Sequence, residues 1–281
     1  MKTDKDIKEM VRQKYSEIAL QDKDSNQSSC CGASCCSTEV YNIMTDDYSN
    51  VKGYEKDADL GLGCGLPTAF AKIKQGDVVL DLGSGAGNDC FVARSETGPG
   101  GKVIGIDFTE AMIDRARQNA DKLGYHNVEF RQGDIEQMPI ADNSIDVVVS
   151  NCVLNLVPNK KQVFSEIYRV LKPGGHFSIS DIVLFGQLPE KVLESAEMYA
   201  GCVSGAIQKQ VYLDHIKELE FENIQIQKEK AILIPDDILV NYLDKNQLDQ
   251  YHSGAYGIES ITVFASKPKS KASCCAPGCC S

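Results

Sequence analysis

Twelve cysteines occur in this 281-residue chain, and the way they are grouped is the strongest chemical signal in the sequence. Eight of them form adjacent pairs near the two ends: Cys30, Cys31, Cys35 and Cys36, and then Cys274, Cys275, Cys279 and Cys280. The other four are single residues in the body of the chain: Cys64, Cys90, Cys152 and Cys202. Thiolates are nucleophiles and soft ligands, so this pattern indicates chemistry on a centre that binds sulfur.

A second chemical signal is a glycine loop that follows a short apolar strand. The segment Val78–Leu82 leads into Gly83-Ser84-Gly85-Ala86-Gly87, where the glycines let the backbone turn sharply and approach a ligand. Asp81 lies two residues before the first glycine, and Asp107 ends the next predicted strand. A carboxylate in the position of Asp107 accepts hydrogen bonds from the ribose hydroxyls of a nucleotide-type cofactor.

The spacing of this loop distinguishes two classes of cofactor. A dinucleotide site has the pattern G-x-G-x-x-G, which fits a pyrophosphate. Here the pattern is G-x-G-x-G, and the carboxylate of Asp81 would repel a pyrophosphate but suits a cationic amino-acid group. These features favour S-adenosylmethionine, whose adenine amino group we expect Asp134 to meet. The predicted cofactor-binding residues are Asp81, Gly83, Ser84, Gly85, Gly87, Asp107, Asp134, Ile135 and Asn151.

An alternation of apolar and amphipathic segments predicts the fold that positions these residues. Strands are expected at Val78–Leu82, Lys102–Asp107, Val128–Gln132, Ile145–Ser150 and His176–Val183, with further candidates at Ile224–Lys228 and Ile261–Ser266. Helices are expected at 4–20, Asn88–Ser95, Thr109–Leu123, Val211–Leu219 and Lys160–Leu171, the last of them stopped by Pro173-Gly174-Gly175. Strands that alternate with helices produce crossover connections, so we predict an α/β fold with a mainly parallel sheet.

Composition and charge restrict the partners and the compartment. A formal net charge of −11 argues against nucleic acid or an anionic membrane as the main partner. No run of apolar residues is long enough to span a bilayer, and the charged N-terminus lacks an apolar signal region. We therefore expect a cytoplasmic protein with reduced thiols, in which the cysteines serve metal, metalloid or redox chemistry and not a disulfide framework.

Four regions are expected along the chain. Residues 1–59 hold the N-terminal helix and the first Cys-rich segment, and residues 60–185 form the domain that binds S-adenosylmethionine. Residues 186–266 form a smaller α+β region for the substrate, and residues 267–281 form a Cys-rich tail. We expect the adjacent cysteines of the tails to bind a soft metal or metalloid.

The single cysteines are interpreted by their positions. Cys152 directly follows the fourth strand, and the carboxyl ends of strands face the ligand crevice in open α/β sheets. Cys152 is therefore expected beside the methyl group to be transferred. Glycines flank Cys64 and Cys202, which indicates exposed loops where a structural thiol has little to pack against. Cys90, among apolar helix neighbours, is interpreted as a small buried hydrophobic residue.

Three convergent thiolates suit a soft centre better than zinc. Zinc usually takes four closed ligands, or an open site supported by histidine, and none of the four histidines has metal-ligand spacing to these cysteines. Trivalent arsenic takes three sulfurs in a pyramid and keeps a lone pair on its open side. That lone pair can attack a sulfonium methyl group.

With these motifs the chain resembles the arsenite methyltransferases, a family of class I S-adenosylmethionine-dependent methyltransferases. The segments that carry the resemblance are Val11–Ala19, Leu60–Gly65, Asp81–Cys90, Ser150–Pro158 and Gly201–Gly205. The resemblance implies a Rossmann-like sheet with helices on both faces and the methylation of arsenite in arsenic detoxification. It also implies that Cys64, Cys152 and Cys202 hold trivalent arsenic, and that an N-terminal cysteine, for which we choose Cys31, exchanges disulfides with the site.

The expected reaction begins when arsenite, as a thiol conjugate, exchanges onto the three thiolates. The lone pair of the arsenic then attacks the methyl group, which formally oxidises the arsenic. Nearby thiols reduce the arsenic again and form a disulfide, and thioredoxin or glutathione reduces that disulfide. Two alternatives are open. A methyltransferase of a small organic acceptor, such as a quinone ring, leaves the three body cysteines unexplained. A non-enzymatic, thiol-rich protein that binds metalloids leaves the cofactor loop unexplained.

Overall fold

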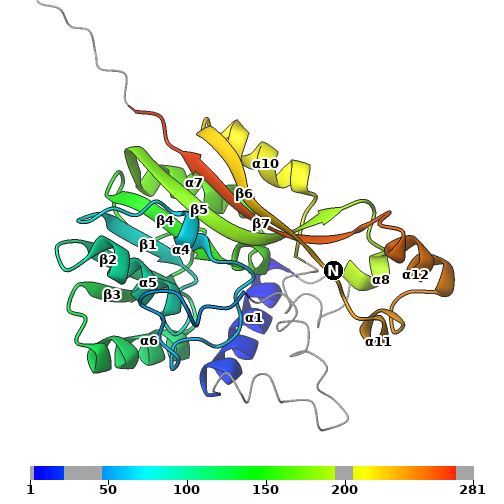
Figure 1. The fold of residues 1–281 in the computed structure, drawn as a ribbon, viewed down its shortest axis with the longest axis horizontal. Coiled ribbons are helices and arrows are strands. Elements are labelled where there is room, and N and C mark those ends of the chain that lie inside the picture. The colour runs from blue at the N-terminus through cyan, green and yellow to red at the C-terminus, as the bar shows by residue number, and fades with distance from the viewer. Residues whose placement is uncertain (1–2, 22–45, 194–204, 270–281) are drawn as a thin grey trace, which may run out of the picture.

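The structure, a computed structural model, describes residues 3–21, 46–193 and 205–269 (Figure 1). Several cysteines of interest lie outside these residues: Cys30, Cys31, Cys35, Cys36, Cys202, Cys274, Cys275, Cys279 and Cys280. Within the described ranges, no helix combines the length and the apolar character needed to cross a membrane.

A seven-stranded sheet with the order β3-β2-β1-β4-β5-β7-β6 forms the centre of the molecule (Figure 1). Its parallel part consists of β1 (Val78–Leu82), β2 (Lys102–Asp107), β3 (Val128–Gln132), β4 (Ile145–Asn151) and β5 (Leu171–Phe185). The strands β7 (Gly257–Ser266) and β6 (Glu222–Ile232) complete it in antiparallel register. The predicted parallel α/β sheet is confirmed, and both late strand candidates lie within β6 and β7.

Helices cover both faces of this sheet, because its central strands are apolar on both sides. Successive side chains of a strand point to opposite faces. Val79 of β1 accordingly packs in one cluster with α5 (Asn88–Thr97) and α6 (Glu110–Leu123), whereas Leu80 packs in another with α7 (Lys160–Val170) and α10 (Lys209–Glu218). The remaining helical elements are α1 (Asp4–Ala19), α4 (Pro67–Phe70), η1 (Leu154–Leu156), α8 (Glu190–Leu193), α11 (Asp236–Leu239) and α12 (Lys245–His252).

The junction between α7 and β5 differs from the prediction. The helix ends at Val170, and the strand begins at once with Leu171, so Pro173-Gly174-Gly175 lies inside the strand instead of stopping the helix. Leu171 pairs with Ile145 of β4, and the register shifts between Ile145 and Val147. This long-range pairing extends β5 beyond the residues whose local pattern indicates a strand. The proposed division near residue 186 stays a prediction.

The N-terminal helix α1 is fixed beside the sheet by polar contacts to both of its ends. Arg115 of α6 donates hydrogen bonds to the carbonyl oxygens of Ala19, at 2.9 Å, and of Gln21. Near the other end, Lys8 pairs with Asp134, which follows β3, at 2.6 Å. These contacts place one side of α1 over the carboxyl edge of the sheet.

Candidate active site

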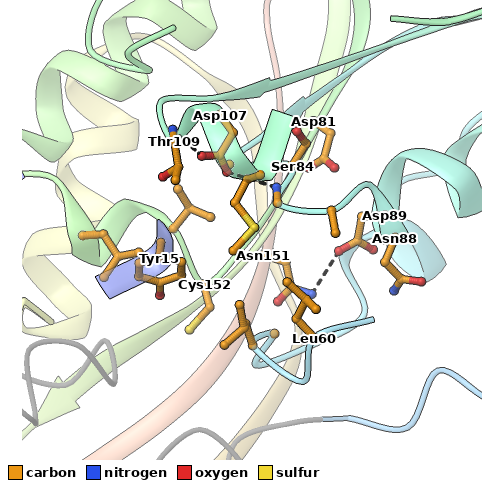
Figure 2. A pocket seen from close by; sticks show the side chains of 18 of the residues that line it. Tyr15, Leu60, Asp81, Ser84, Asn88, Asp89, Asp107, Thr109, Asn151 and Cys152 are labelled. Atoms are coloured by element: carbon orange, nitrogen blue, oxygen red, sulfur yellow. Dashed lines mark hydrogen bonds between the residues drawn. The ribbon is translucent and has the colours of Figure 1, made fainter. Parts of the chain in front are cut away.

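A pocket opens at the carboxyl ends of β1, β2 and β4, and Figure 2 shows the side chains around it. The walls include Lys8 and Tyr15 of α1 as well as residues from the loop between Ala58 and Gly63. The predicted residues that line the pocket are Asp81, Gly83, Ser84, Gly85, Asp107, Asp134, Ile135, Asn151 and Cys152. Residues that are widely separated in the sequence therefore meet here because parallel strands end at the same edge.

The glycine loop has the left-handed backbone that only glycine adopts easily. The φ angles are +65° at Gly83, +51° at Gly85 and +102° at Gly87. A Cβ atom on Gly83 would lie 2.4 Å from the Val153 side chain, so any larger residue at this position would clash with Val153. Gly87, a predicted cofactor ligand, does not line the pocket. A Cβ atom there would lie 2.9 Å from the ring of Phe91, which indicates a packing role at the start of α5.

Asp107 is held rigidly at the end of β2. One carboxylate oxygen accepts a hydrogen bond from the Gly85 N–H at 3.0 Å, and the other accepts one from the Thr109 N–H at 2.8 Å. The side chain is buried, and burial raises its pKa above the ordinary value. The two backbone donors fix the plane of the carboxylate and leave further lone pairs for a ligand in the pocket.

Two buried polar atoms on the pocket wall fit a polar cofactor. The hydroxyl oxygen of Ser84 and the side-chain carbonyl oxygen of Asn88 have no hydrogen-bond partner among the described residues. Buried polar groups are almost always hydrogen-bonded, so such atoms indicate a ligand or water. Ribose hydroxyls and an amino-acid group, both present in S-adenosylmethionine, match the groups that these atoms and Asp107 can bind.

A pair of buried carboxylates lies beyond the glycine loop. Asp81 is 2% exposed and accepts a hydrogen bond from the Cys90 thiol at 3.2 Å. Burial, together with the charge of Asp89, raises the pKa of Asp81 well above its ordinary value. Burial also raises the pKa of Asp89 to about 6, against hydrogen bonds that favour its charged form. Neither carboxylate has an ion-pair partner within the part of the chain that the structure describes, so the pair suits a cationic ligand group.

Asp89 and Tyr48 are functional candidates that the sequence reasoning missed. Both line the pocket, and the Tyr48 hydroxyl donates a hydrogen bond to Asp89 at 2.8 Å. An acid in the first helical turn after the glycine loop was a usable signal for Asp89. Nothing local to Tyr48 indicated its role, because the contact joins residues that are 41 positions apart.

Asp134 and Ile135 lie on the opposite wall of the pocket. The Asp134 carboxylate accepts a hydrogen bond from Lys8 at 2.6 Å, and Lys8 also pairs with Glu136. Asp134 is therefore already bound to α1 at the position where we expected it to meet an adenine. Ile135 is buried and supplies an apolar surface there.

Cys152 has a constrained position directly after β4. Its φ angle is +60°, and its N–H donates to the Ser180 carbonyl oxygen of β5 at 2.8 Å. The side chain is 4% exposed and lines the pocket. A residue other than glycine is uncommon in this backbone region, and such conformations concentrate at functional sites.

The prediction that Cys64 lies in an exposed loop is wrong. Its side chain is 0% exposed and packs in the same apolar cluster as Cys152, Leu156 and Ile182. The flanking glycines let the loop backbone lie close to neighbouring side chains. A Cβ atom on Gly63 would lie 2.6 Å from the Asn151 amide, and one on Gly65 would lie 2.5 Å from the Ser180 hydroxyl. The loop can thus press its cysteine into the protein only because its neighbours have no side chains.

The other cysteines complete this description. Cys90 is fully buried in an apolar cluster, as predicted, although its thiol also contacts Asp81. Cys202, the third predicted arsenic ligand, lies outside the described residues. In the described part of the chain, no group of three or more His, Cys, Asp or Glu side chains is arranged to hold a metal ion.

The sheet, the glycine loop and the pocket at the carboxyl edge define a class I methyltransferase. In agreement, a family model described as a methyltransferase domain matches residues 73–239. An arsenite methyltransferase of Halobacterium salinarum is 41% identical over 94% of this chain and 67% of the relative. The chain therefore belongs to the arsenite methyltransferase family.

Further comparisons agree with this assignment. An arsenite methyltransferase of Aquipseudomonas alcaligenes is 32% identical over 84% of this chain and 68% of the relative. A crystal structure of an arsenic(III) S-adenosylmethionine methyltransferase from Chlamydomonas reinhardtii superposes with a TM-score of 0.64 at 33% identity, over 83% of this chain and 74% of that one. A demethylmenaquinone methyltransferase of Listeria welshimeri is 38% identical, but over only 39% of this chain and 47% of the relative.

Proposed function

We propose that this protein methylates trivalent arsenic with S-adenosylmethionine as the methyl donor. The observation that carries the proposal is the burial of two thiols, Cys64 and Cys152, in one apolar cluster, from which Cys152 also lines the pocket. S-adenosylmethionine supplies an electrophilic methyl group, and trivalent arsenic has the lone pair that accepts it. A buried pair of thiols gives no advantage to an organic acceptor, which needs no soft ligands.

The residues of the glycine loop and its neighbours bind the cofactor in this proposal. Asp107 accepts hydrogen bonds from the ribose hydroxyls, and Asp81 and Asp89 hold the cationic amino-acid end. Gly83 and Gly85 allow the backbone to approach the ligand closely. These roles follow from the fixed carboxylate of Asp107 and from the buried acids that lack a basic partner among the described residues.

The arsenic ligands in this proposal are Cys64, Cys152 and Cys202. Arsenite, as a thiol conjugate, is transferred to them by successive exchange of As–S bonds. Accepting a methyl group leaves the arsenic formally oxidised by two electrons, and two thiolates return those electrons and form a disulfide. We propose Cys31 as one partner in that exchange and thioredoxin or glutathione as the external reductant.

A speciation assay tests the proposed function directly. The full-length protein is incubated with arsenite, S-adenosylmethionine and a thiol reductant, and the arsenic species are separated by chromatography with arsenic-specific mass detection. Methylated arsenic that appears only in the presence of S-adenosylmethionine supports the proposal. Unchanged arsenite, from a protein shown to bind the cofactor, contradicts it and favours the organic-acceptor alternative.

A further inference from the structure

We propose that Asn151 is a positioning residue that sets the spacing between the two buried thiols by holding the Cys64 loop against the end of β4. The inference rests on the proposed function, because it treats Cys64 and Cys152 as arsenic ligands. Asn151, which was predicted to bind the cofactor, lines the pocket, and its side chain makes its hydrogen bonds to protein groups.

The acceptor side of the Asn151 amide binds the backbone of the cysteine loop. Its oxygen accepts hydrogen bonds from the Cys64 N–H at 2.9 Å and from the Gly65 N–H at 3.2 Å. A carbonyl oxygen has two lone pairs, so both are used. Because the loop joins β4 from 87 residues away in the chain, this contact fixes where Cys64 lies relative to the sheet.

The nitrogen of the same amide makes further contacts to the loop and to its neighbours. This nitrogen, which carries two N–H groups, lies 2.9 Å from the Gly65 carbonyl oxygen and 2.7 Å from the Tyr48 hydroxyl. It also lies 3.1 Å from Asp89, a contact that Figure 2 marks. The Tyr48 hydroxyl, which donates to Asp89, also lies 3.1 Å from the Gly65 carbonyl oxygen. The loop is thus tied to β4 through both the oxygen and the nitrogen of the Asn151 side chain.

The position of Asn151 in the chain links this contact to the second thiol. Cys152 is the next residue, and its left-handed backbone and its hydrogen bond to Ser180 fix the direction of its side chain. Figure 2 shows the two side chains leaving adjacent backbone positions. One side chain of this dipeptide is a thiol of the site, and the other fixes the loop that bears the second thiol.

Removing the amide should affect arsenic binding more than cofactor binding. Asn151→Ala leaves the N–H groups of Cys64 and Gly65 without their acceptor and releases the loop from β4. Loss of a residue that orients a metal ligand typically lowers affinity about 10–100-fold. We expect the KM for arsenite, measured with saturating S-adenosylmethionine, to rise by about that factor. The dissociation constant for S-adenosylmethionine should rise less, and only because the amide also donates to Asp89. X-ray absorption at the arsenic edge should count fewer As–S bonds than in the wild type.

Asn127→Ala is a matched control at the opposite edge of the sheet. Asn127 is also a half-buried asparagine that holds a glycine loop, with its nitrogen donating to the carbonyl oxygens of Gly98, at 3.1 Å, and Gly101, at 2.9 Å. The Asn127→Ala variant should have lower thermal stability, but the same KM for arsenite and the same number of As–S bonds as the wild type. If a general loss of stability were the cause, the KM for arsenite would rise in both variants. If Asn151 has a positioning role, the KM rises only in Asn151→Ala.

An exchange of residues keeps the test informative if the alanine variant does not fold. Asn151→Asp alone places a carboxylate against Asp89, and it should weaken arsenite binding to the cofactor-free protein, measured by equilibrium dialysis. Adding Asp89→Asn restores an amide and a carboxylate in exchanged positions, and it should recover most of that binding. No recovery, or an Asn151→Ala variant with normal arsenite binding and weakened cofactor binding, overturns the inference. Failure of the wild-type protein to bind arsenite overturns the proposed function instead.

Discussion

The two ends of the pocket are built in different ways. The cofactor end is made by short-range backbone features of successive strands, such as the contact between Gly85 and Asp107, which are 22 residues apart. The thiol end is made by long-range contacts: Cys64 is held by Asn151, 87 residues away, and by the Ser260 hydroxyl, 196 residues away. The cofactor end therefore combines a sequence motif with a few longer contacts, such as that between Asn151 and Asp89, whereas the contacts at the thiol end are all between distant parts of the chain.

This difference implies that the two ends can be damaged separately. A substitution at the thiol end should remove arsenic chemistry and spare the cofactor, and a substitution at the cofactor end should do the reverse. Energetic effects at sites with no shared partners are close to additive, and the exception here is Asn151, which contacts both Cys64 and Asp89. The four tests below run from the largest expected effect to the smallest.

The largest effect is expected for Cys152→Ser. A hydroxyl is a poor ligand for a soft centre, so arsenite methylation should be abolished while binding of S-adenosylmethionine stays nearly normal. Chromatographic speciation and calorimetric titration with the cofactor measure the two properties. Cys90→Ser is the matched control, since its hydroxyl can still donate to Asp81 and the residue does not line the pocket. A fully active Cys152→Ser enzyme would remove this residue from the arsenic site.

The converse effect is expected for Asp107→Asn. The change removes the proposed charge-assisted hydrogen bonds to the ribose, worth about 1.5–3 kcal/mol, and so should weaken S-adenosylmethionine binding about 10–100-fold. Binding of arsenite to the cofactor-free protein should be unchanged, as measured by equilibrium dialysis. An equal loss of affinity for S-adenosylmethionine and for arsenite would show that the two ends do not act independently.

A smaller effect is expected from pH. Burial raises the pKa of Asp89 to about 6, so this group is protonated in the free protein below that pH and loses its attraction for the cationic cofactor. Affinity for S-adenosylmethionine should therefore fall by about tenfold from pH 7 to pH 5, since the bound cation holds the carboxylate ionised. Asp81, whose pKa is also raised, acts in the same direction. In Asp89→Asn the dependence should be flatter, and an unchanged profile would assign it to another group.

The smallest effect concerns the backbone at Cys152, where φ is +60°. Glycine adopts this conformation without cost, whereas a residue with a Cβ atom is destabilised by about 1 kcal/mol. Cys152→Gly should therefore be more stable than Cys152→Ala by about that amount, measured by thermal or urea unfolding. A more stable alanine variant would mean that the loop after β4 relaxes and that no strain is held there.

The two ends also differ in how far the sequence predicts them. The strands Val78–Leu82 and Lys102–Asp107 were predicted with their observed bounds, because apolar runs and turn residues report local structure directly. The burial of Cys64 was not predicted, because glycine flanks indicate an exposed loop unless the residues packed against them are known. Those residues, Asn151 and Ser180, belong to other strands.

The same limit explains the other differences between the predictions and the structure. The early start of β5 depends on the pairing of Leu171 with Ile145, which no local pattern contains. Gly87 was assigned to the cofactor because it completes the motif, yet the structure places the rings of Phe91 and Phe130 against it. Tyr48 became visible as a site residue only through its contact with Asp89.

The apolar surroundings of Cys64 and Cys152 have a consequence for selectivity. Trivalent arsenic bound by three thiolates, as proposed, carries no net charge, so a cluster that includes Leu156 and Ile182 can enclose it without a large desolvation cost. Phosphate and arsenate are anions that must keep their hydration or gain cationic partners. The site would therefore exclude the abundant oxyanions of the cell because burying their charge costs too much free energy, whatever their shape.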